Sequence, residues 1–278
     1  MITNQPIGIF DSGIGGLTVF SSILKALPQY DYIYFGDNAR APYGSRSFNT
    51  IHQYTWECVQ WLFQQGCPLV ILACNTASAR ALRTIQQQDL EKAGYQDRRV
   101  LGVIRPTAEV IGNYSDTKQI GVLGTKGTVN SGSYLLEIVK FAPEVKVYQQ
   151  ACPLWVPLIE NGEHEKPGAD YFIKEYLDQL MGQCKDIDTL LLACTHYPLL
   201  AEKIKANLAE NFTVVSQGDI VADSLVDYLN RHREMEARLS KDATRRFYTT
   251  TDDTSDFDNL AAMFFPEEVK ANHVAMKG

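Results

Sequence analysis

The sequence predicts an α/β protein in which parallel sheets are flanked by helices. Short apolar runs, typical of buried strands, alternate along the chain with segments whose apolar residues recur at helical spacing. The length of 278 residues suits two ordinary domains or one large α/β domain. A weak internal repeat is a third observation. Strands that alternate with helices are typical of a parallel sheet covered on both faces.

The first series of elements contains three strand-like runs, and each leads into a helical segment. The predicted strands are 7–10, 32–35 and 69–73. The predicted helices are 17–27, which Pro28 ends, 54–63 and 77–85. This order of elements predicts a parallel sheet in the first part of the chain.

A second series begins at residue 100. Its predicted strands are 100–104, 120–123, 145–148 and 190–193, and its predicted helices are 134–139, 171–181 and a segment after Pro198. The tail adds predicted strands at 213–215 and 247–250, and amphipathic segments at 221–229 and 257–264. Periodicity alone does not assign this tail to either series.

The internal repeat links the two series. Residues 7–13 (IGIFDSG) resemble 120–126 (IGVLGTK), and residues 70–76 (VILACNT) resemble 190–196 (LLLACTH), at offsets of 113 and 120. Short apolar runs also resemble one another by chance, so duplication and coincidence stay equally open. If two similar lobes face each other, Cys74 and Cys194 lie at equivalent strand ends and face one cleft.

Composition favours a small molecule as the partner. The net charge is −7 and no block of five like charges occurs, so the chain lacks the basic footprint of a protein that binds nucleic acid or an anionic membrane. The longest apolar run, 69–74, is far shorter than the ~20 residues of a membrane span. Residues 1–6 lack the basic and apolar parts of a signal peptide. We therefore expect a cytoplasmic protein.

No motif predicts a metal or a cofactor. The six cysteines form no CxxC pair, and no His-x3-His is present. The loop 11–16 (DSGIGG) has Thr18 where a dinucleotide fingerprint needs its third glycine. The glycines of this loop either let a strand turn into a helix or bring Asp11 to a substrate. We expect neither a bound metal nor a cofactor.

Two cysteines occupy matching positions. Cys74 and Cys194 each follow an apolar strand and precede hydroxyl or amide residues at a helix start, where the thiol pKa is lowered. The matching contexts favour a chemical role over the usual one of a small buried side chain. The remaining cysteines have no such company and are assigned structural roles: Cys58, Cys67, Cys152 and Cys184.

Two equivalent acid/base groups on opposite sides of a substrate suit stereoinversion at carbon. One thiol removes a proton from one face, and the other delivers a proton to the opposite face. Asp11 and His196 are placed to polarise one thiol each. A redox disulfide usually has CxxC spacing, and a Cys-His nucleophile needs only one thiol. Donors for a substrate carboxylate are present in the loops that carry Tyr43, Gly44, Asn75, Thr76 and Thr195.

Five segments carry a resemblance to a known family: 7–18, 36–44, 73–77, 151–157 and 193–199. With these segments the chain resembles the glutamate racemases of the cofactor-independent aspartate/glutamate racemase superfamily, over nearly its whole length. The resemblance implies an isomerase that interconverts L- and D-glutamate and supplies D-glutamate for peptidoglycan. It also implies two similar α/β lobes, each a mostly parallel sheet flanked by helices, with the active site in the cleft between them.

The resemblance further implies lobe boundaries and residue roles. Lobe 1 is 1–99 completed by 215–278, and lobe 2 is 100–214. Cys74 acts on the D-enantiomer with Asp11, and Cys194 acts on the L-enantiomer with His196. The implied substrate contacts are Asp11, Ser12, Tyr43, Gly44, Asn75, Thr76, Thr125, Glu160, Thr195 and His196. No cofactor is implied, and a homodimer is compatible with these features.

The chain departs from the family pattern in its tail. Residues 215–218 (VSQG) carry a glutamine where serine often precedes glycine directly, and 249–252 (TTTD) lack a glycine after the strand. We expect both departures to affect how the tail docks and to leave the chemistry unchanged. Two rivals stay open: a relative acting on aspartate, and a two-lobed protein that binds an acidic amino acid and has inert cysteines.

Overall fold

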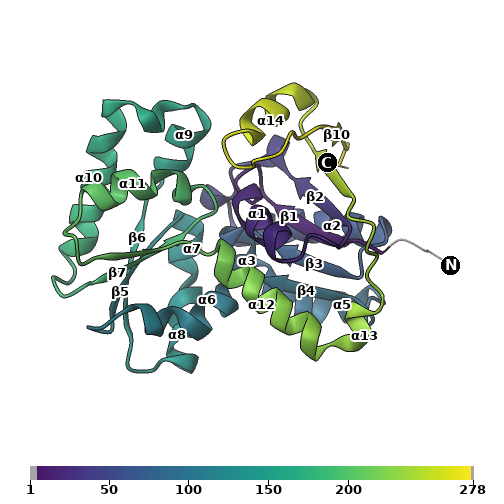
Figure 1. The fold of residues 1–278 in the computed structure, drawn as a ribbon, viewed down its shortest axis with the longest axis horizontal. Coiled ribbons are helices and arrows are strands. Elements are labelled where there is room, and N and C mark those ends of the chain that lie inside the picture. Colours follow the sequence, from purple (N-terminus) through teal and green to yellow (C-terminus); the bar gives the residue numbers. More distant parts are fainter. Residues whose placement is uncertain (1–4, 277–278) are drawn as a thin grey trace.

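The computed structural model describes residues 5–276 and contains two parallel sheets (Figure 1). The six-stranded sheet has the order β10-β9-β2-β1-β3-β4, and the four-stranded sheet has the order β6-β5-β7-β8. Every strand pair in both sheets is parallel. The predicted α/β class with two mostly parallel sheets is confirmed. Residues 1–4, part of the segment without signal-peptide features, lie outside the described residues.

The strands follow the apolar runs of the sequence. The six-stranded sheet consists of β1 (Ile7–Asp11), β2 (Tyr32–Gly36), β3 (Leu69–Leu72), β4 (Arg99–Gly102), β9 (Arg245–Thr249) and β10 (Ala271–His273). The four-stranded sheet consists of β5 (Gln119–Gly124), β6 (Lys146–Ala151), β7 (Thr189–Ala193) and β8 (Thr213–Val215). Every residue of β1, β2, β3 and β7 is buried, as expected for strands covered on both faces.

Helices cover both faces of the sheets. The helices up to the second sheet are α1 (Leu17–Ala26), α2 (Phe48–Gln64), α3 (Asn75–Arg80), α4 (Leu82–Thr84), α5 (Leu90–Lys92) and α6 (Ile104–Val110). The later helices are α7 (Lys126–Ser131), α8 (Ser133–Phe141), α9 (Trp155–Glu160), α10 (Pro167–Met181), α11 (Ala201–Ala206), α12 (Gly218–Arg231), α13 (Arg233–Glu236) and α14 (Thr254–Ala261). Short 3-10 turns at Tyr43–Ser45 and Tyr197–Leu200 carry parts of the site.

Side-chain alternation along β1 divides the core of the first sheet. Ile7 and Ile9 join the cluster built on α1 and α12, whereas Phe10 joins the cluster built on α2. Helices α1 and α12 pack against each other, although they are far apart in the sequence. The chain therefore returns to its first sheet after passing through the second.

One predicted element lies in a different sheet. The strand expected at 100–104, as the start of the second series, is β4 and pairs with β3 in the first sheet. An apolar run predicts a buried strand but not its partner, so the sequence did not reveal this pairing. The change of sheet falls between β4 and β5. The lobe division into 1–99 with 215–278 and 100–214 stays a prediction.

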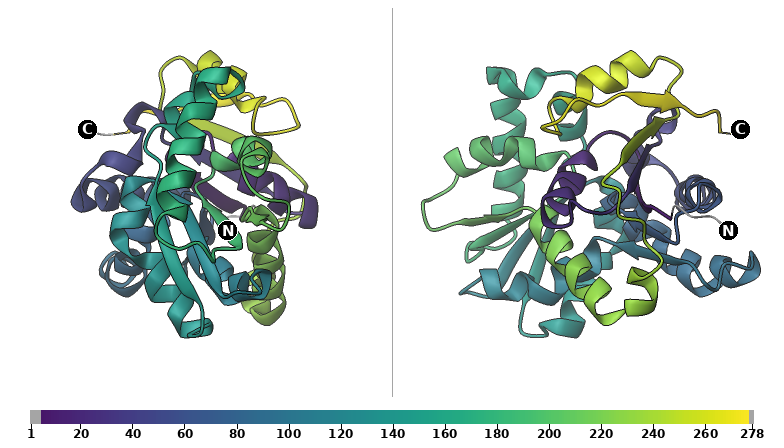
Figure 2. Two further views of the ribbon diagram at one scale, coloured as in Figure 1. Left: turned by 90° about the vertical axis from the view of Figure 1, so that its left-hand side faces the viewer. Right: turned by 45° about the vertical axis from the view of Figure 1, so that its right-hand side comes forward.

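The tail contributes to both sheets. Strand β8 pairs with β7, whereas β9 pairs with β2 and β10 pairs with β9. Figure 2 shows this C-terminal segment, in yellow, beside the purple N-terminal strands. Within residues 5–276 no helix is long and apolar enough to cross a membrane. Because all strands are parallel, the loops that follow them gather at one edge of each sheet.

Candidate active site

A cavity of about 40 Å³ lies between the loops that follow strands of the two sheets. Its lining residues are Ser12, Gly13, Ala41, Pro42, Tyr43, Gly44, Cys74, Asn75, Thr76, Thr125, Val156, Glu160, Cys194, Thr195 and His196. All the predicted site residues except Asp11 are among them. One water needs about 10–15 Å³, so this space holds a few waters at most. The structure therefore shows a closed cleft.

Cys74 follows β3 and caps the N-terminus of α3. Its Sγ accepts a hydrogen bond from the Ala77 backbone N–H at 3.4 Å and lies 3.3 Å from Ser12 Oγ. Burial raises the pKa of the Cys74 thiol to about 12, the nearby charge of Asp11 adds to this, and the two hydrogen bonds only partly oppose it. The lowered pKa expected for Cys74 is therefore wrong in the closed cleft, because desolvation outweighs a short helix N-terminus.

Asp11 ends β1 and is buried behind the cavity wall. The Gly13 backbone N–H donates to Asp11 Oδ2 at 3.0 Å, and Oδ1 has no hydrogen-bond partner among the described residues. Burial raises the pKa of this carboxyl, while His196 and the Gly13 N–H lower it less. Gly16 packs directly on Asp11, with only 2.5 Å from the position of an added Cβ to the Asp11 Cβ.

His196 connects Cys194, which follows β7, to Glu160 at the end of α9. Nε2 of His196 lies 2.9 Å from Glu160 Oε1, and Cys194 is close enough to influence the charge of the ring. Burial opposes the charged imidazole, but the hydrogen bonds and charges of Cys194 and Glu160 outweigh it and raise the His196 pKa to about 10. Phe264 packs its ring edge-on against His196, with 5.2 Å between centroids. Cys194 and Glu160 therefore both favour the charged form of the imidazole.

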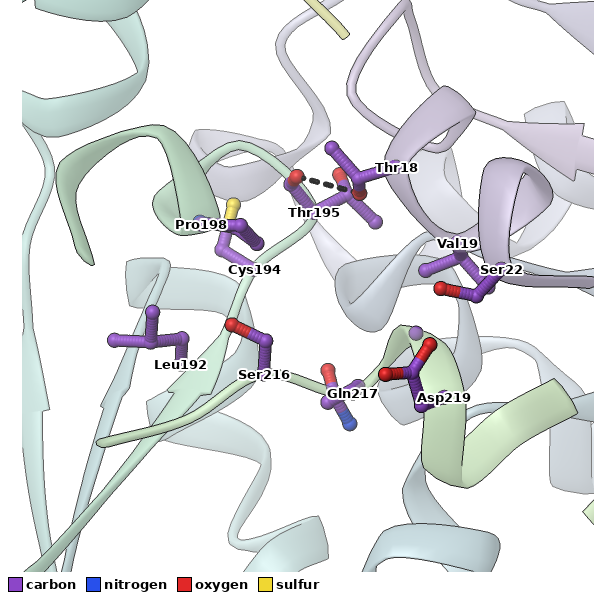
Figure 3. A pocket seen from close by; sticks show the side chains of 11 residues that line it. Thr18, Val19, Ser22, Leu192, Cys194, Thr195, Pro198, Ser216, Gln217 and Asp219 are labelled. Atoms are coloured by element: carbon purple, nitrogen blue, oxygen red, sulfur yellow. Dashed lines mark hydrogen bonds between the residues drawn. The ribbon is translucent and has the colours of Figure 1, made fainter. Parts of the chain in front are cut away.

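Gly15 allows the two sides of the cleft to meet. A Cβ at this position would overlap the His196 ring and lie 2.6 Å from Thr195 Oγ1. Thr18, three residues later, donates its hydroxyl to the Thr195 carbonyl at 2.9 Å (Figure 3). Gly15 has no positive φ. The glycine is needed because it lacks a side chain, and it brings the loop after β1 against the loop after β7.

A second contact between the two sides involves hydroxyl groups. Thr76 Oγ1 and Thr125 Oγ1 lie 2.8 Å apart, and Gly44 is so close to Thr125 that an added Cβ would lie 2.8 Å from the Thr125 Cβ. The Tyr43 hydroxyl donates to the buried Asp37 carboxylate, and this bond directs it away from the polar groups that line the cavity. Gly44, Thr76 and Thr125 therefore form the closed edge of the cleft.

Comparison with known proteins identifies the family to which the chain belongs. A protein-family model described as Asp/Glu/Hydantoin racemase matches residues 7–225, which is most of the chain. The chain belongs to the Asp/Glu/hydantoin racemase family. The resemblance read from the sequence is confirmed, and membership places the chain among enzymes of the isomerase class.

Individual relatives agree with this family. The glutamate racemase of Sulfurihydrogenibium sp. (strain YO3AOP1) is 40% identical over 260 residues and 93% of both chains. The crystal structure of glutamate racemase isoform RacE1 from Bacillus anthracis superposes with a TM-score of 0.88 at 33% identity, covering 99% of this chain and 98% of that one. A Francisella tularensis glutamate racemase, solved in complex with D-glutamate, has a TM-score of 0.85 at 33% identity with the same coverage.

The other four cysteines of this racemase-family chain lie outside the cavity. All six cysteines are free thiols. Cys58 accepts a hydrogen bond from Arg40 Nη2 at 3.3 Å, and burial raises the pKa of Cys58 and Cys152 well above the ordinary value. Among residues 5–276, no group of three or more His, Cys, Asp or Glu could hold a metal ion.

Several residues of the site were not predicted from the sequence: Gly13, Ala41 and Pro42 line the cavity beside predicted residues, and two more come from other segments. Val156 on α9 lines the cavity. Gln217 accepts a hydrogen bond from Asn75 Nδ2 at 2.7 Å, next to Cys74. Gln217 therefore lies beside the cleft, because the segment after β8 reaches Asn75. Gln217 also edges a larger cavity of about 160 Å³ that shares Cys194 and Thr195 with the closed cleft (Figure 3).

Proposed function

We propose that the protein is a cofactor-independent glutamate racemase that interconverts L- and D-glutamate by proton transfer between two thiols. The observation that carries the proposal is that Cys74 and Cys194, from corresponding strand ends of two sheets, line one cavity. Glutamate racemases similar over nearly the whole chain support glutamate as the substrate. One of these relatives was solved with D-glutamate.

The proposed reaction is one proton removed and one proton added at the same carbon. With L-glutamate, the thiolate of Cys194 takes the α-proton and the thiol of Cys74 gives its proton to the opposite face of the carbanion. With D-glutamate the two cysteines exchange roles. Each thiol ends in the protonation state in which the other began, so the reverse reaction uses the same groups.

The neighbours of each thiol supply different help. His196 lies beside Cys194, and we propose that its imidazole assists proton transfer at that thiol. Cys74 accepts from the Ala77 N–H, lies within hydrogen-bond distance of the Ser12 hydroxyl, and has the buried Asp11 carboxyl nearby. We propose that Cys74 rests as the thiol in the closed cleft and that Asp11 takes part in its deprotonation.

The substrate carboxylates are held by neutral donors. Hydroxyl and amide groups from both sides of the cleft line the cavity, and these are Ser12, Asn75, Thr76, Thr125 and Thr195. Because the Tyr43 hydroxyl donates to Asp37, we propose that Tyr43 and Gly44 contribute through the backbone. Glu160 lines the cavity and lies against His196, and we propose that it holds that imidazole.

The small cavity implies that the cleft opens to admit substrate. A space of about 40 Å³ is far too small for glutamate beside two thiols. The pair formed by Thr76 and Thr125 joins the two sides by a hydrogen bond that the substrate can replace. We propose that opening breaks this contact and that closing over glutamate brings both thiols to the α-carbon.

Polarimetry on the purified protein separates the proposal from its rivals. Without added pyridoxal phosphate, the rotation of L-glutamate should decay to zero while L-aspartate stays unchanged. Decay with aspartate alone would identify the relative acting on aspartate. Binding of either amino acid without any change of rotation would identify a binding protein with inert cysteines.

Deuterated water tests whether two bases act. The proton taken from L-glutamate goes to Cys194, and the one added comes from Cys74, which has exchanged with solvent. Early D-glutamate should therefore be fully labelled, while recovered L-glutamate stays unlabelled. D-glutamate that keeps its original α-hydrogen, or substrate labelled as fast as product appears, contradicts the two-thiol mechanism.

We also propose that the product supplies peptidoglycan synthesis in the cytoplasm, and a homodimer stays a prediction. A cell that depends on this enzyme should require external D-glutamate when the enzyme is removed. Growth without D-glutamate, in a cell with no other source of it, would contradict that role.

A further inference from the structure

Gln217 lies at the N-cap position of α12 and is only 4% exposed. Its side-chain amide closes a ring of hydrogen bonds with two other buried residues. Asn75 Nδ2 donates to Gln217 Oε1 at 2.7 Å, Gln217 Nε2 donates to Tyr134 Oη at 2.6 Å, and Tyr134 Oη donates to Asn75 Oδ1 at 2.6 Å. The ring contains one residue of the cavity wall, Asn75, and two residues outside it.

The direction of these hydrogen bonds is fixed by a neighbour. The Thr107 hydroxyl donates to the Val103 carbonyl at 2.9 Å, so its oxygen is left to accept a hydrogen bond. Gln217 Nε2 lies 2.8 Å from that oxygen and must be the donor. The Gln217 oxygen therefore faces Asn75, and the Asn75 nitrogen, not its oxygen, must point toward Gln217.

This orientation decides what Asn75 offers to a ligand. The Asn75 oxygen accepts from Tyr134, and one of the two Nδ2 hydrogens goes to Gln217. The second Nδ2 hydrogen remains for a group in the cavity. A reversed amide would place its oxygen where the nitrogen lies, and two acceptors, Gln217 Oε1 and Asn75 Oδ1, would then face each other.

We propose that Gln217 is a positioning residue for the racemisation, which it serves by holding the Asn75 amide so that an N–H faces the substrate carboxylate. The inference rests on the proposed function for its substrate. Gln217 does not touch the reacting atoms. It acts through Asn75, the residue next to Cys74, and it connects the start of α3 to α6, α8 and α12.

Steady-state kinetics of Gln217→Met test this role. Methionine keeps the volume but removes both hydrogen-bonding groups, so Asn75 loses its fixed orientation. KM should rise about tenfold in both directions, the loss of roughly one hydrogen bond to a charged group, while kcat changes less than about threefold. Tyr134→Phe removes the bond to Asn75 Oδ1 and the bond from Gln217 Nε2 but keeps the one from Asn75 Nδ2 to Gln217 Oε1, so it should raise KM in the same direction by a smaller factor.

Thr189→Val is the matched control. It also removes a buried hydrogen bond, from Thr189 Oγ1 to the Tyr114 carbonyl at 2.7 Å, at the end of β7 away from Cys194. Its melting temperature should fall as that of Gln217→Met does, but its KM should match the wild type. An equal rise of KM in the control would show that loss of stability, and not positioning, causes the effect.

A double-mutant cycle tests whether the effect runs through Asn75. Asn75→Ala alone should raise KM, and adding Gln217→Met to it should change KM by less than about twofold, because residues that act through one another are not additive. A further tenfold rise in the double variant overturns the inference.

The Asn75 side-chain amide gives a readout that needs no substrate. In ¹⁵N-labelled wild-type protein its NH₂ signals, assigned with Asn75→Asp, should show one slowly exchanging, hydrogen-bonded proton that Gln217→Met loses. Unchanged signals overturn the inference whatever the enzyme acts on. A wild-type protein that does not racemise glutamate overturns the proposed function instead, and the amide signals then decide the role of Gln217 by themselves.

Discussion

The strand ends of β3 and β7 carry the same residue in the same position but surround it with different charges. Cys74 has a buried carboxyl, Asp11, nearby, and burial raises its pKa to about 12. Cys194 instead has His196 beside it, and the pKa of His196 is raised to about 10 although burial opposes its charge. A repeated strand-to-helix turn therefore fixes where each thiol lies, whereas other residues decide which charged groups surround it.

The largest expected effect comes from removing either thiol. Cys74→Ser and Cys194→Ser should each lower kcat by a factor of ~10² to 10⁴, because a hydroxyl is a far poorer base than a thiolate at neutral pH. Racemisation assays in both directions measure this. Cys184→Ser, which changes a half-buried cysteine outside the cavity, should keep nearly full activity. Equal activity in all three variants would contradict the proposal that Cys74 and Cys194 are the catalytic thiols.

The second largest effect is expected from a change at Gly15, which packs against the residues that follow Cys194. Gly15→Ala places a methyl group where the His196 ring now lies, so His196 and Thr195 must shift. A displacement on the order of 1 Å in a catalytic group can cost ~10²-fold, and we expect kcat/KM to fall by about 10- to 100-fold. Gly168→Ala is the control, since a Cβ at that glycine of α10 meets nothing within 4 Å. A Gly15→Ala enzyme as active as the control contradicts the close approach.

An effect that depends on the direction of the reaction separates the roles of Asp11 and His196. Asp11→Asn should alter the isotope effect mainly when D-glutamate is the substrate, and His196→Asn mainly when L-glutamate is, with rate losses of roughly 10- to 100-fold. The equilibrium between enantiomers stays fixed, because one catalyst serves both directions. Primary deuterium isotope effects measured in each direction check this. Identical patterns in the two variants would mean that the helpers do not serve separate thiols.

The smallest effect is a dependence of stability on pH. The folded protein holds a proton on His196 up to about pH 10, whereas the unfolded chain releases it near 6.5. This contribution to stability is complete below pH 6.5 and is lost as pH rises through 10. The melting temperature of the wild type should therefore fall more steeply across this range than that of His196→Asn, by a few degrees. Parallel curves would show that His196 is not charged in the folded protein.

The sequence predicted the positions of both thiols because each follows a buried strand, and parallel strands deliver their following loops to one edge. It did not predict that β4 pairs in the first sheet, because apolar residues such as Val100 and Leu101 suit a buried strand of either sheet equally well. It also could not predict the hydrogen bonds between Glu160 and His196 or between Gln217 and Asn75, because they join segments far apart in the chain. The raised pKa of Cys74 depends on burial, which a local motif does not reveal.

The tight cavity between the two sides has a consequence for timing under the two-thiol proposal. A proton on either thiol can exchange with bulk water only while the cleft is open. When D-glutamate leaves, Cys194 still carries the proton that it took and Cys74 has lost its own, so the protonation state of the free enzyme depends on which product it last released. Before the enzyme can act on another L-glutamate, the proton on Cys194 must be lost and Cys74 must regain one. Each turnover in one direction therefore includes a step of the empty enzyme that does not involve glutamate.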